Sequence, residues 1–138
     1  MRESRRDAVR AMKKLIYVAL DVCVVLIFVV IGLHAHGHRE TLGNLVSVSA
    51  PFLLGVVLAW ALQYRRQKGR SLLRNGVEVW LITVVVGQVV RLIDGQGSAL
   101  GFVLVTVGFL GACMLGWRLV VLGASRLGGR SAVRSKVS

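Results

Sequence analysis

Acidic residues, cysteine and proline are all scarce in this chain. Its 138 residues hold 6 acidic against 18 basic side chains, 2 cysteines and 1 proline. Charged residues make up 17% of the sequence, below the roughly one quarter that is usual in a soluble domain. They stand in short blocks between long apolar runs, a segregation that a water-soluble core does not produce. The composition therefore argues against an ordinary soluble domain and indicates lipid around most of the chain.

Missing motifs exclude most kinds of chemistry. Cys23 and Cys113 lie inside apolar runs without CxxC or Cys/His spacing, so zinc and thioredoxin-like sites have no support and both are expected to be packing residues. Glycine-rich phosphate loops, Ser/His/Asp arrangements and HExxH or EF-hand patterns are absent. A catalytic pair of Asp21 and Glu78 is disfavoured because they lie in different runs at different depths. We predict no cofactor and no catalytic residue, and an enzyme acting on lipid-linked substrates is the weakest alternative.

Four apolar runs are the main feature that is present. They cover residues 15–33, 45–63, 76–93 and 99–122. Each is close to the ~20 residues that a helix needs to cross a bilayer core of ~30 Å, and too long for a membrane β-strand of ~10 residues. Because the connections are short, neighbouring helices are forced antiparallel. The sequence predicts an all-α fold, an integral membrane up-down bundle of four transmembrane helices.

Basic segments flank this predicted bundle. Residues 1–14 form a basic N-terminal segment, and residues 123–138 form a basic tail rich in Arg, Ser and Gly, which we expect to be disordered. All Lys and Arg residues except Arg39 and Arg91 lie in the N-terminal segment, between the second and third runs, or at the end of the fourth run and in the tail. By the positive-inside rule, this distribution predicts a plasma-membrane protein with both termini in the cytoplasm.

The basic character of the chain has two readings. A net charge of +12 would suggest nucleic acid binding in a soluble protein, but no basic face is available between the apolar runs. We therefore expect no nucleic-acid partner, and expect the basic loops to contact the bilayer and its anionic inner-leaflet lipids. Trp60, Trp80 and Trp117 each fall near the inner end of a run, as an interfacial aromatic belt predicts.

Three ionisable residues lie near the inner ends of the runs, where a charge in hydrocarbon costs at least about 2.5–3.5 kcal/mol. Asp21 stands about 9 Å below the inner boundary of the first run at ~1.5 Å per residue. Arg118 lies at a similar depth in the fourth run, and Glu78 is shallower in the third. We expect these residues to cluster. Three alternatives are open for Asp21. It forms an ion pair with Arg118 that fixes helix register, it titrates in a proton or substrate site, or it faces a water-filled crevice without its partner.

A second polar group marks the outer end of the third run. Gln88 and Arg91 lie within this run, and Asp94 and Gln96 follow it. Arg91 is expected to point into the bundle and cap the glycine turn that contains Asp94 and Gln96. The alternative is that Arg91 offers a fixed cation to an anionic ligand or lipid headgroup.

Three histidines alternate in the first outer loop. His34, His36 and His38 face one way in an extended segment, and imidazoles at such positions bind zinc or copper. No cysteine accompanies them, and histidines are common in solvent loops. We therefore predict no metal site, and keep metal binding and pH sensing by these residues as weaker alternatives.

Small residues recur at helical spacing in two runs, where they would allow close helix packing in lipid. In the second run these are Ser47, Pro51, Gly55 and Ala59, and in the fourth they are Gly101, Gly108, Ala112 and Gly116. Both stripes are predicted packing faces, and Pro51 is expected to bend its helix.

Many of these residues also match a known pattern. The match is carried by Asp21 and residues 24–32, by His36, Pro51, Phe52, Gly55 and Trp60, by Trp80, Thr83, Gly87, Arg91 and residues 95–97, and by Phe102, Val103 and residues 116–118. On these residues the chain resembles a family of small four-helix membrane proteins, found mainly in actinobacteria and haloarchaea and catalogued as a domain of unknown function. The resemblance spans residues 20–118 and implies the fold and a bacterial plasma-membrane setting, but no activity. Relatives usually carry an arginine where this chain has Leu33, so an outer anion role rests on Arg91.

The leading functional interpretation is a non-enzymatic plasma-membrane bundle that self-associates or serves a larger membrane complex. The rival class is a small transporter or channel that uses Asp21, with Arg118, and Arg91 as intramembrane polar sites. A transporter is expected to lose function with Asp21→Asn while it still folds, whereas a structural subunit is expected to tolerate that change.

Overall fold

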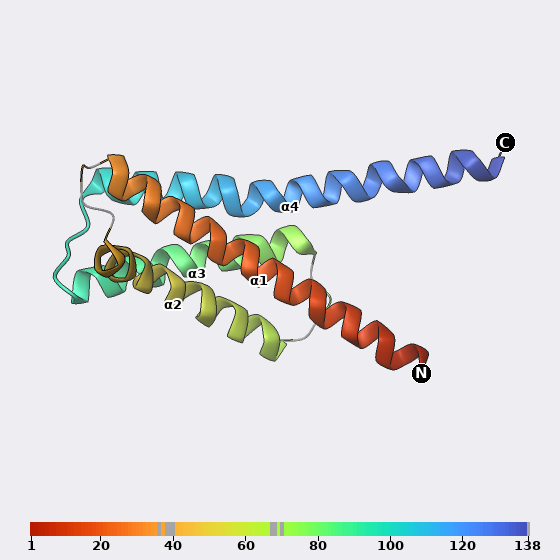
Figure 1. Ribbon diagram of the computed structural model, residues 1–138, viewed down its shortest axis with the longest axis horizontal. Helices are drawn as coiled ribbons and strands as arrows, with labels where there is room; N and C mark the ends of the chain where they lie inside the picture. Colours follow the sequence, from red (N-terminus) through yellow and green to blue (C-terminus); the bar gives the residue numbers. More distant parts are fainter. Residues whose placement is uncertain (36, 38–40, 67–68, 70, 138) are drawn as a thin grey trace.

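Four helices account for most of the chain. The computed structural model describes all residues except 36, 38–40, 67–68, 70 and 138, and describes no side chains beyond residue 129. The helices are α1 (Arg2–Ala35), α2 (Leu42–Arg66), α3 (Leu72–Ile93) and α4 (Leu100–Val137), shown in Figure 1. Each helix overlaps one of the four apolar runs and extends beyond it at one or both ends, and each is long and apolar enough to cross a membrane. The all-α, four-helix prediction is confirmed.

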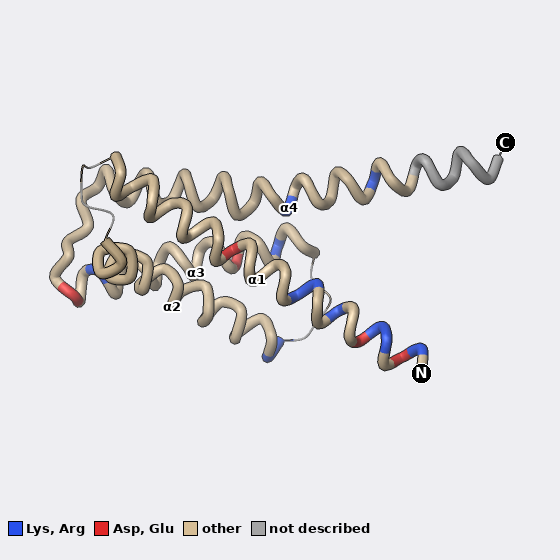
Figure 2. The backbone as a smooth tube through the Cα atoms, viewed as in Figure 1, with Lys and Arg blue, Asp and Glu red and all other residues tan. Residues whose placement is uncertain are grey.

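The helices pack as an up-down bundle. Helix α1 contacts α2, α2 contacts α3, α3 contacts α4, and α4 returns to contact α1, with the most extensive packing between α2 and α3. The α1–α2 and α3–α4 connections lie at one end, and both termini project from the opposite end (Figure 1). Figure 2 shows most of the Lys and Arg positions toward the end that carries the termini.

Local sequence explains where α3 begins and ends. Ser71 is the N-cap, and its side chain accepts a hydrogen bond of 3.3 Å from the backbone N–H of Arg74. The turn after α3 contains Gly95 at φ 70° and Gly97 at φ 71°, a backbone region that favours glycine. These two glycines let the chain reverse into α4 within a few residues.

The C-terminal tail differs from expectation. The segment 123–138 was expected to be disordered, but α4 continues as a helix to Val137. The one proline of the chain lies in α2, so nothing in the tail blocks helix propagation. Arg, Leu, Ala and Lys are good helix formers, and a helix already nucleated over an apolar run extends at little cost.

Helices α2 and α3 approach closely along the stripe expected on α2. Pro51, Gly55 and Ala59 are buried, whereas Ser47 is exposed. A Cβ added at Gly55 would lie 2.7 Å from the Cα of Thr83, so the absence of a side chain permits this contact. Figure 1 shows the start of α2 end-on and the rest of the helix across the view, in agreement with the bend expected from Pro51.

The predicted packing face of α4 is wrong within this bundle. Gly101, Gly108 and Ala112 are exposed, Gly116 is half-buried, and a Cβ added at any of these three glycines would meet nothing within 4 Å. The inward stripe instead consists of Thr106, Leu110, Met114 and Arg118, which are all buried. Positions two apart differ by about 200° around a helix, so turning Arg118 inward turns the small residues outward.

The phenylalanines cluster in the core, and the surface of the bundle is largely apolar. All 4 phenylalanines lie together, with ring centroids 5.8 Å apart for Phe28–Phe52, 5.5 Å for Phe28–Phe109 and 6.3 Å for Phe52–Phe102. Large apolar side chains on all four helices point outward, while the buried set includes polar and charged side chains. This inverted distribution is typical of helices that meet lipid.

Candidate functional site

Asp21 and Arg118 form an ion pair at the centre of the bundle. The Arg118 Nη1 donates to Asp21 Oδ1 at 2.8 Å, and Nη2 donates to Asp21 Oδ2 at 2.7 Å. Both side chains are 0% exposed. The pair joins α1 to α4, and its fork-to-fork geometry is the strongest arrangement for an arginine and a carboxylate.

Two tryptophans complete the shell around the carboxylate. The indole N–H of Trp60 donates to Asp21 Oδ2 at 3.1 Å, and that of Trp117 donates to Asp21 Oδ1 at 3.1 Å. Each carboxylate oxygen thus accepts two hydrogen bonds, which fills its acceptor capacity. Trp60 comes from α2, so the shell links three of the four helices.

Arg118 is held by contacts other than Asp21 as well. Its Nη1 also donates to the carbonyl oxygen of Met114 at 2.7 Å, and its guanidinium lies 4.2 Å from the ring centroid of Trp117. A Cβ added at Gly76 would collide with the Arg118 side chain, so glycine on α3 leaves the space that the arginine occupies. The Nε of Arg118 is buried without a hydrogen-bond partner.

Glu78 pairs elsewhere. Its carboxylate lies 3.8 Å from Nη1 of Arg66 on α2, in an ion pair whose side chains are 27% and 60% exposed. The structure thus brings together Asp21 and Arg118 of the three residues expected to cluster, and gives Glu78 a partner of its own. The shallower depth of Glu78 explains this, since Arg66 at the end of α2 reaches it from solvent.

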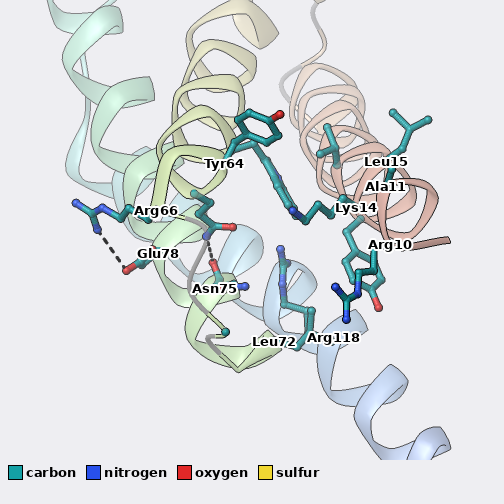
Figure 3. A pocket seen from close by; sticks show the side chains of 15 residues that line it. Arg10, Ala11, Lys14, Leu15, Tyr64, Arg66, Leu72, Asn75, Glu78 and Arg118 are labelled. Atoms are coloured by element: carbon teal, nitrogen blue, oxygen red, sulfur yellow. Dashed lines mark hydrogen bonds and ion pairs between the residues drawn. The ribbon is translucent and has the colours of Figure 1, made fainter. Parts of the chain in front are cut away.

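A cleft opens above the buried pair, toward the end of the bundle that carries the termini. Its volume is about 760 Å³, and residues from all four helices line it. We call it the basic cleft, and its polar lining includes Arg10, Lys14, Gln63, Tyr64, Asn75 and Arg118. In Figure 3, Arg10 and Lys14 extend from α1 toward the space that Asn75 and Arg118 border from the other side.

At the opposite end, Arg91 is tied to the turn after α3. Its Nη1 donates to Gln96 Oε1 at 2.9 Å, the Gln96 backbone N–H donates to the Arg91 carbonyl at 3.0 Å, and the guanidinium lies 4.3 Å from the ring centroid of Phe102. The Ser98 hydroxyl donates a hydrogen bond to Gln88 Oε1, and Asp94 is the exposed C-cap of α3. These contacts match the turn-capping interpretation of Arg91.

The histidine hypothesis is largely outside the described residues. His36 and His38 belong to the part of the chain that is not described, and His34 lies in the last turn of α1. Over the described residues, no group of three His, Cys, Asp or Glu side chains lies close enough to hold a metal.

Sequence reasoning missed the roles of Trp60, Trp117 and Gly76. Their positions in the sequence predict an interfacial belt, but Trp60 and Trp117 donate to Asp21, and Trp80 donates to the carbonyl of Val107 at 3.1 Å. One signal was available: Trp60 and Trp117 lie near the depth of Asp21, and a buried carboxylate needs donors besides one arginine.

Comparison with known proteins agrees with the resemblance seen in the sequence. Neither the curated proteins nor the solved structures contain a match to this chain. A family profile described as "Protein of unknown function (DUF3054)" matches residues 18–121, a region that contains Asp21, Arg118 and all three tryptophans. The chain therefore belongs to this family of proteins of unknown function.

Proposed function

We propose that this chain is a four-span protein of a bacterial plasma membrane, with both termini and the α2–α3 connection in the cytoplasm. Two features support the topology. Large apolar side chains cover the outside of all four helices, and the basic residues gather toward the end that carries the termini (Figure 2). The positive-inside rule assigns such an end to the cytoplasm.

We further propose that the bundle has a non-enzymatic role, as a self-associating protein or a subunit of a larger membrane complex. The observation that carries this proposal is the state of Asp21. Its carboxylate is 0% exposed, is neutralised by Arg118 and has both oxygens fully bonded. Such a group fixes the relative position of α1, α2 and α4, and this is what a scaffold requires.

The rival class, a small transporter, uses the same carboxylate differently. A carrier carboxylate must exchange a proton or ion with water on each cycle. Asp21 would have to release four hydrogen bonds and leave Arg118 buried without a counter-charge, which is costly in an apolar setting. A feature that favours transport is the basic cleft, because it reaches from the surface to Arg118.

One experiment separates the two classes. The full chain is purified in a gentle detergent, its assemblies are weighed by intact-complex mass spectrometry, and the same sample is reconstituted into sealed vesicles that carry a pH-sensitive dye. We expect assemblies with a second copy or another membrane protein, and a proton leak no greater than that of empty vesicles.

Two outcomes would contradict the proposal. One is a chain that remains monomeric and alone at all gentle conditions. The other is a proton or ion flux that the full chain supports and the Asp21→Asn variant abolishes while it remains folded. A matched variant, Asp94→Asn, removes an exposed carboxylate at the other end and controls for the change of charge.

A further inference from the structure

We propose that the basic cleft binds a phosphate group, carried by a lipid headgroup of the adjoining leaflet or by a small soluble ester. The inference rests on the proposed function, because the proposed topology places this cleft at the cytoplasmic surface of the bilayer. It adds a ligand class to a bundle for which the buried pair alone suggests only a structural role.

Two cations on the α1 wall of the basic cleft lack an acidic partner over the described residues. Arg66 pairs with Glu78, and Arg118 pairs with Asp21. Over the described part of the chain, Arg10 and Lys14 make no ion pair, and Lys14 lies 5.8 Å from the ring centroid of Tyr64. The α1 wall of the cleft therefore presents two cations without an acidic partner, and phosphate oxygens form charge-assisted hydrogen bonds with such cations.

Arg118 also has a buried hydrogen-bond donor without a partner. Arg118 borders the floor of the cleft with its side chain 0% exposed, and its Nε has no hydrogen-bond partner although Nη1 and Nη2 are both bonded. A buried unsatisfied donor costs on the order of 1–3 kcal/mol. This Nε lies beside Gly76 of α3. An acceptor oxygen that passes the floor of the cleft and reaches Nε relieves that cost, and an anionic oxygen does so best.

The basic cleft has the size and the mixed lining of a small-molecule site. At about 760 Å³ the cleft falls within the ~300–1,000 Å³ that small-molecule sites occupy. Leu15, Val18 and Leu72 line it together with the polar residues. Lys14 and Asp21 are seven positions apart on α1, about 10 Å along the helix, so the cleft runs from the basic surface toward the apolar interior. A phosphate joined to an apolar body fits this gradient.

The α1 cations of the cleft also lie outside the family match. Arg10 and Lys14 precede residue 18, where the match begins, whereas Asn75 and Arg118 lie within it. Phosphate binding is thus inferred from this chain's own residues and is not implied by family membership.

A titration of the purified full chain tests the proposal. Dioctanoyl-phosphatidylglycerol is added in mild detergent and binding is followed by the fluorescence of tryptophan, since Trp60 lines the cleft. We expect the double variant Arg10→Gln/Lys14→Gln to weaken binding by about tenfold or more, because charged hydrogen bonds contribute strongly. The matched control Arg5→Gln/Lys13→Gln removes the same two residue types from the same helix, outside this cleft, and we expect a change of about twofold or less.

Further variants and ligands separate the remaining readings. Ala11→Leu fills part of the cleft from exposed α1 without a change of charge or of tryptophan content, and is expected to weaken binding as the double variant does. Dioctanoylglycerol lacks the phosphate and is expected not to bind. If inorganic phosphate displaces the phosphatidylglycerol at equal concentration, the cleft is still a phosphate site, but its ligand is a soluble ester and not a lipid. Equal losses in both double variants, or equal binding of dioctanoylglycerol, would overturn the proposal.

Phosphate binding and membrane topology can be measured independently of each other. All substituted positions are exposed, so each variant is expected to keep its helix content and melting midpoint. A topology reporter on the same variants then shows which idea fails. A cytoplasmic C-terminus without phosphate binding refutes the site alone, and a periplasmic C-terminus with intact binding refutes the topology alone.

Discussion

At the residue scale, the feature that most shapes this protein is an ion pair enclosed between its helices. Asp21 and Arg118 are fully buried, and the indoles of Trp60 and Trp117 occupy the remaining acceptor positions of the carboxylate. In such a setting the loss of one charge is far more damaging than the loss of both, because a lone buried charge has no compensation.

This asymmetry predicts the behaviour of substitutions at the pair. Asp21→Asn keeps one carbonyl oxygen, enough for one of the two tryptophans, and leaves the Arg118 cation without a counter-charge. We expect it to lower the free energy of unfolding by about 3–5 kcal/mol, so the buried pair replaces the expectation from the sequence that a structural subunit tolerates this change. The double variant Asp21→Asn/Arg118→Met removes the buried charge and keeps the side-chain volume, so we expect it to recover much of that loss. Thermal unfolding in detergent measures both.

Additive losses in the double variant would contradict this account, since they would show that the two residues act independently. A charge swap, Asp21→Arg with Arg118→Asp, is less informative, because the tryptophan N–H groups of α2 and α4 point to an acceptor at position 21. An arginine at that position would face two donors.

At the scale of helices, rotation about each axis is set by the most polar residue as well as by the smallest ones. Helix α2 presents Gly55 to Thr83, as the stripe of small residues predicts. Helix α4 turns Arg118 inward and so leaves Gly108 facing out. A small-residue pattern identifies a face that permits close packing, but it does not reveal which partner within one chain occupies that face.

A matched pair of glycine substitutions tests this assignment. Gly55→Ala places a Cβ 2.7 Å from the Cα of Thr83, where backbone must move, and we expect a loss of about 1–3 kcal/mol in unfolding free energy. Gly108→Ala meets nothing within 4 Å, and we expect no loss and a gain of at most about 1 kcal/mol from helix propensity. Melting curves in detergent provide the comparison. A loss at Gly108 as large as that at Gly55 would show that the outward face of α4 is packed.

The helices and the pair were largely predictable from the sequence, but the shell around the pair was not. Run length and hydropathy located all four helices, and equal depth in the first and fourth runs pointed to Asp21 and Arg118 as partners. The indole donors were missed because a tryptophan near a span end satisfies an interfacial role equally well. The helical tail was missed because composition describes disorder on average, whereas a long helix already formed at Leu122 lowers the cost of the next turn.

At the scale of the whole molecule, charge and hydropathy divide the bundle along its length. One end carries the termini and most of the basic residues, the middle exposes apolar side chains on every helix, and the other end holds the glycine turn beside Arg91. The two ends therefore differ in charge, and this difference would orient the molecule in a bilayer. The basic cleft lies at the basic end. The proposed topology, and with it access of the cleft to cytoplasmic ligands, depends on this placement.

Reporter fusions to the full chain and to a truncated chain test that placement most directly. One reporter is joined after Ser138 and a second after Gln96, in the turn between α3 and α4. The account predicts that a fluorescent protein matures at Ser138 and alkaline phosphatase stays inactive there, while alkaline phosphatase is active after Gln96. Active alkaline phosphatase at Ser138, or a full chain that remains in solution without detergent, would contradict it.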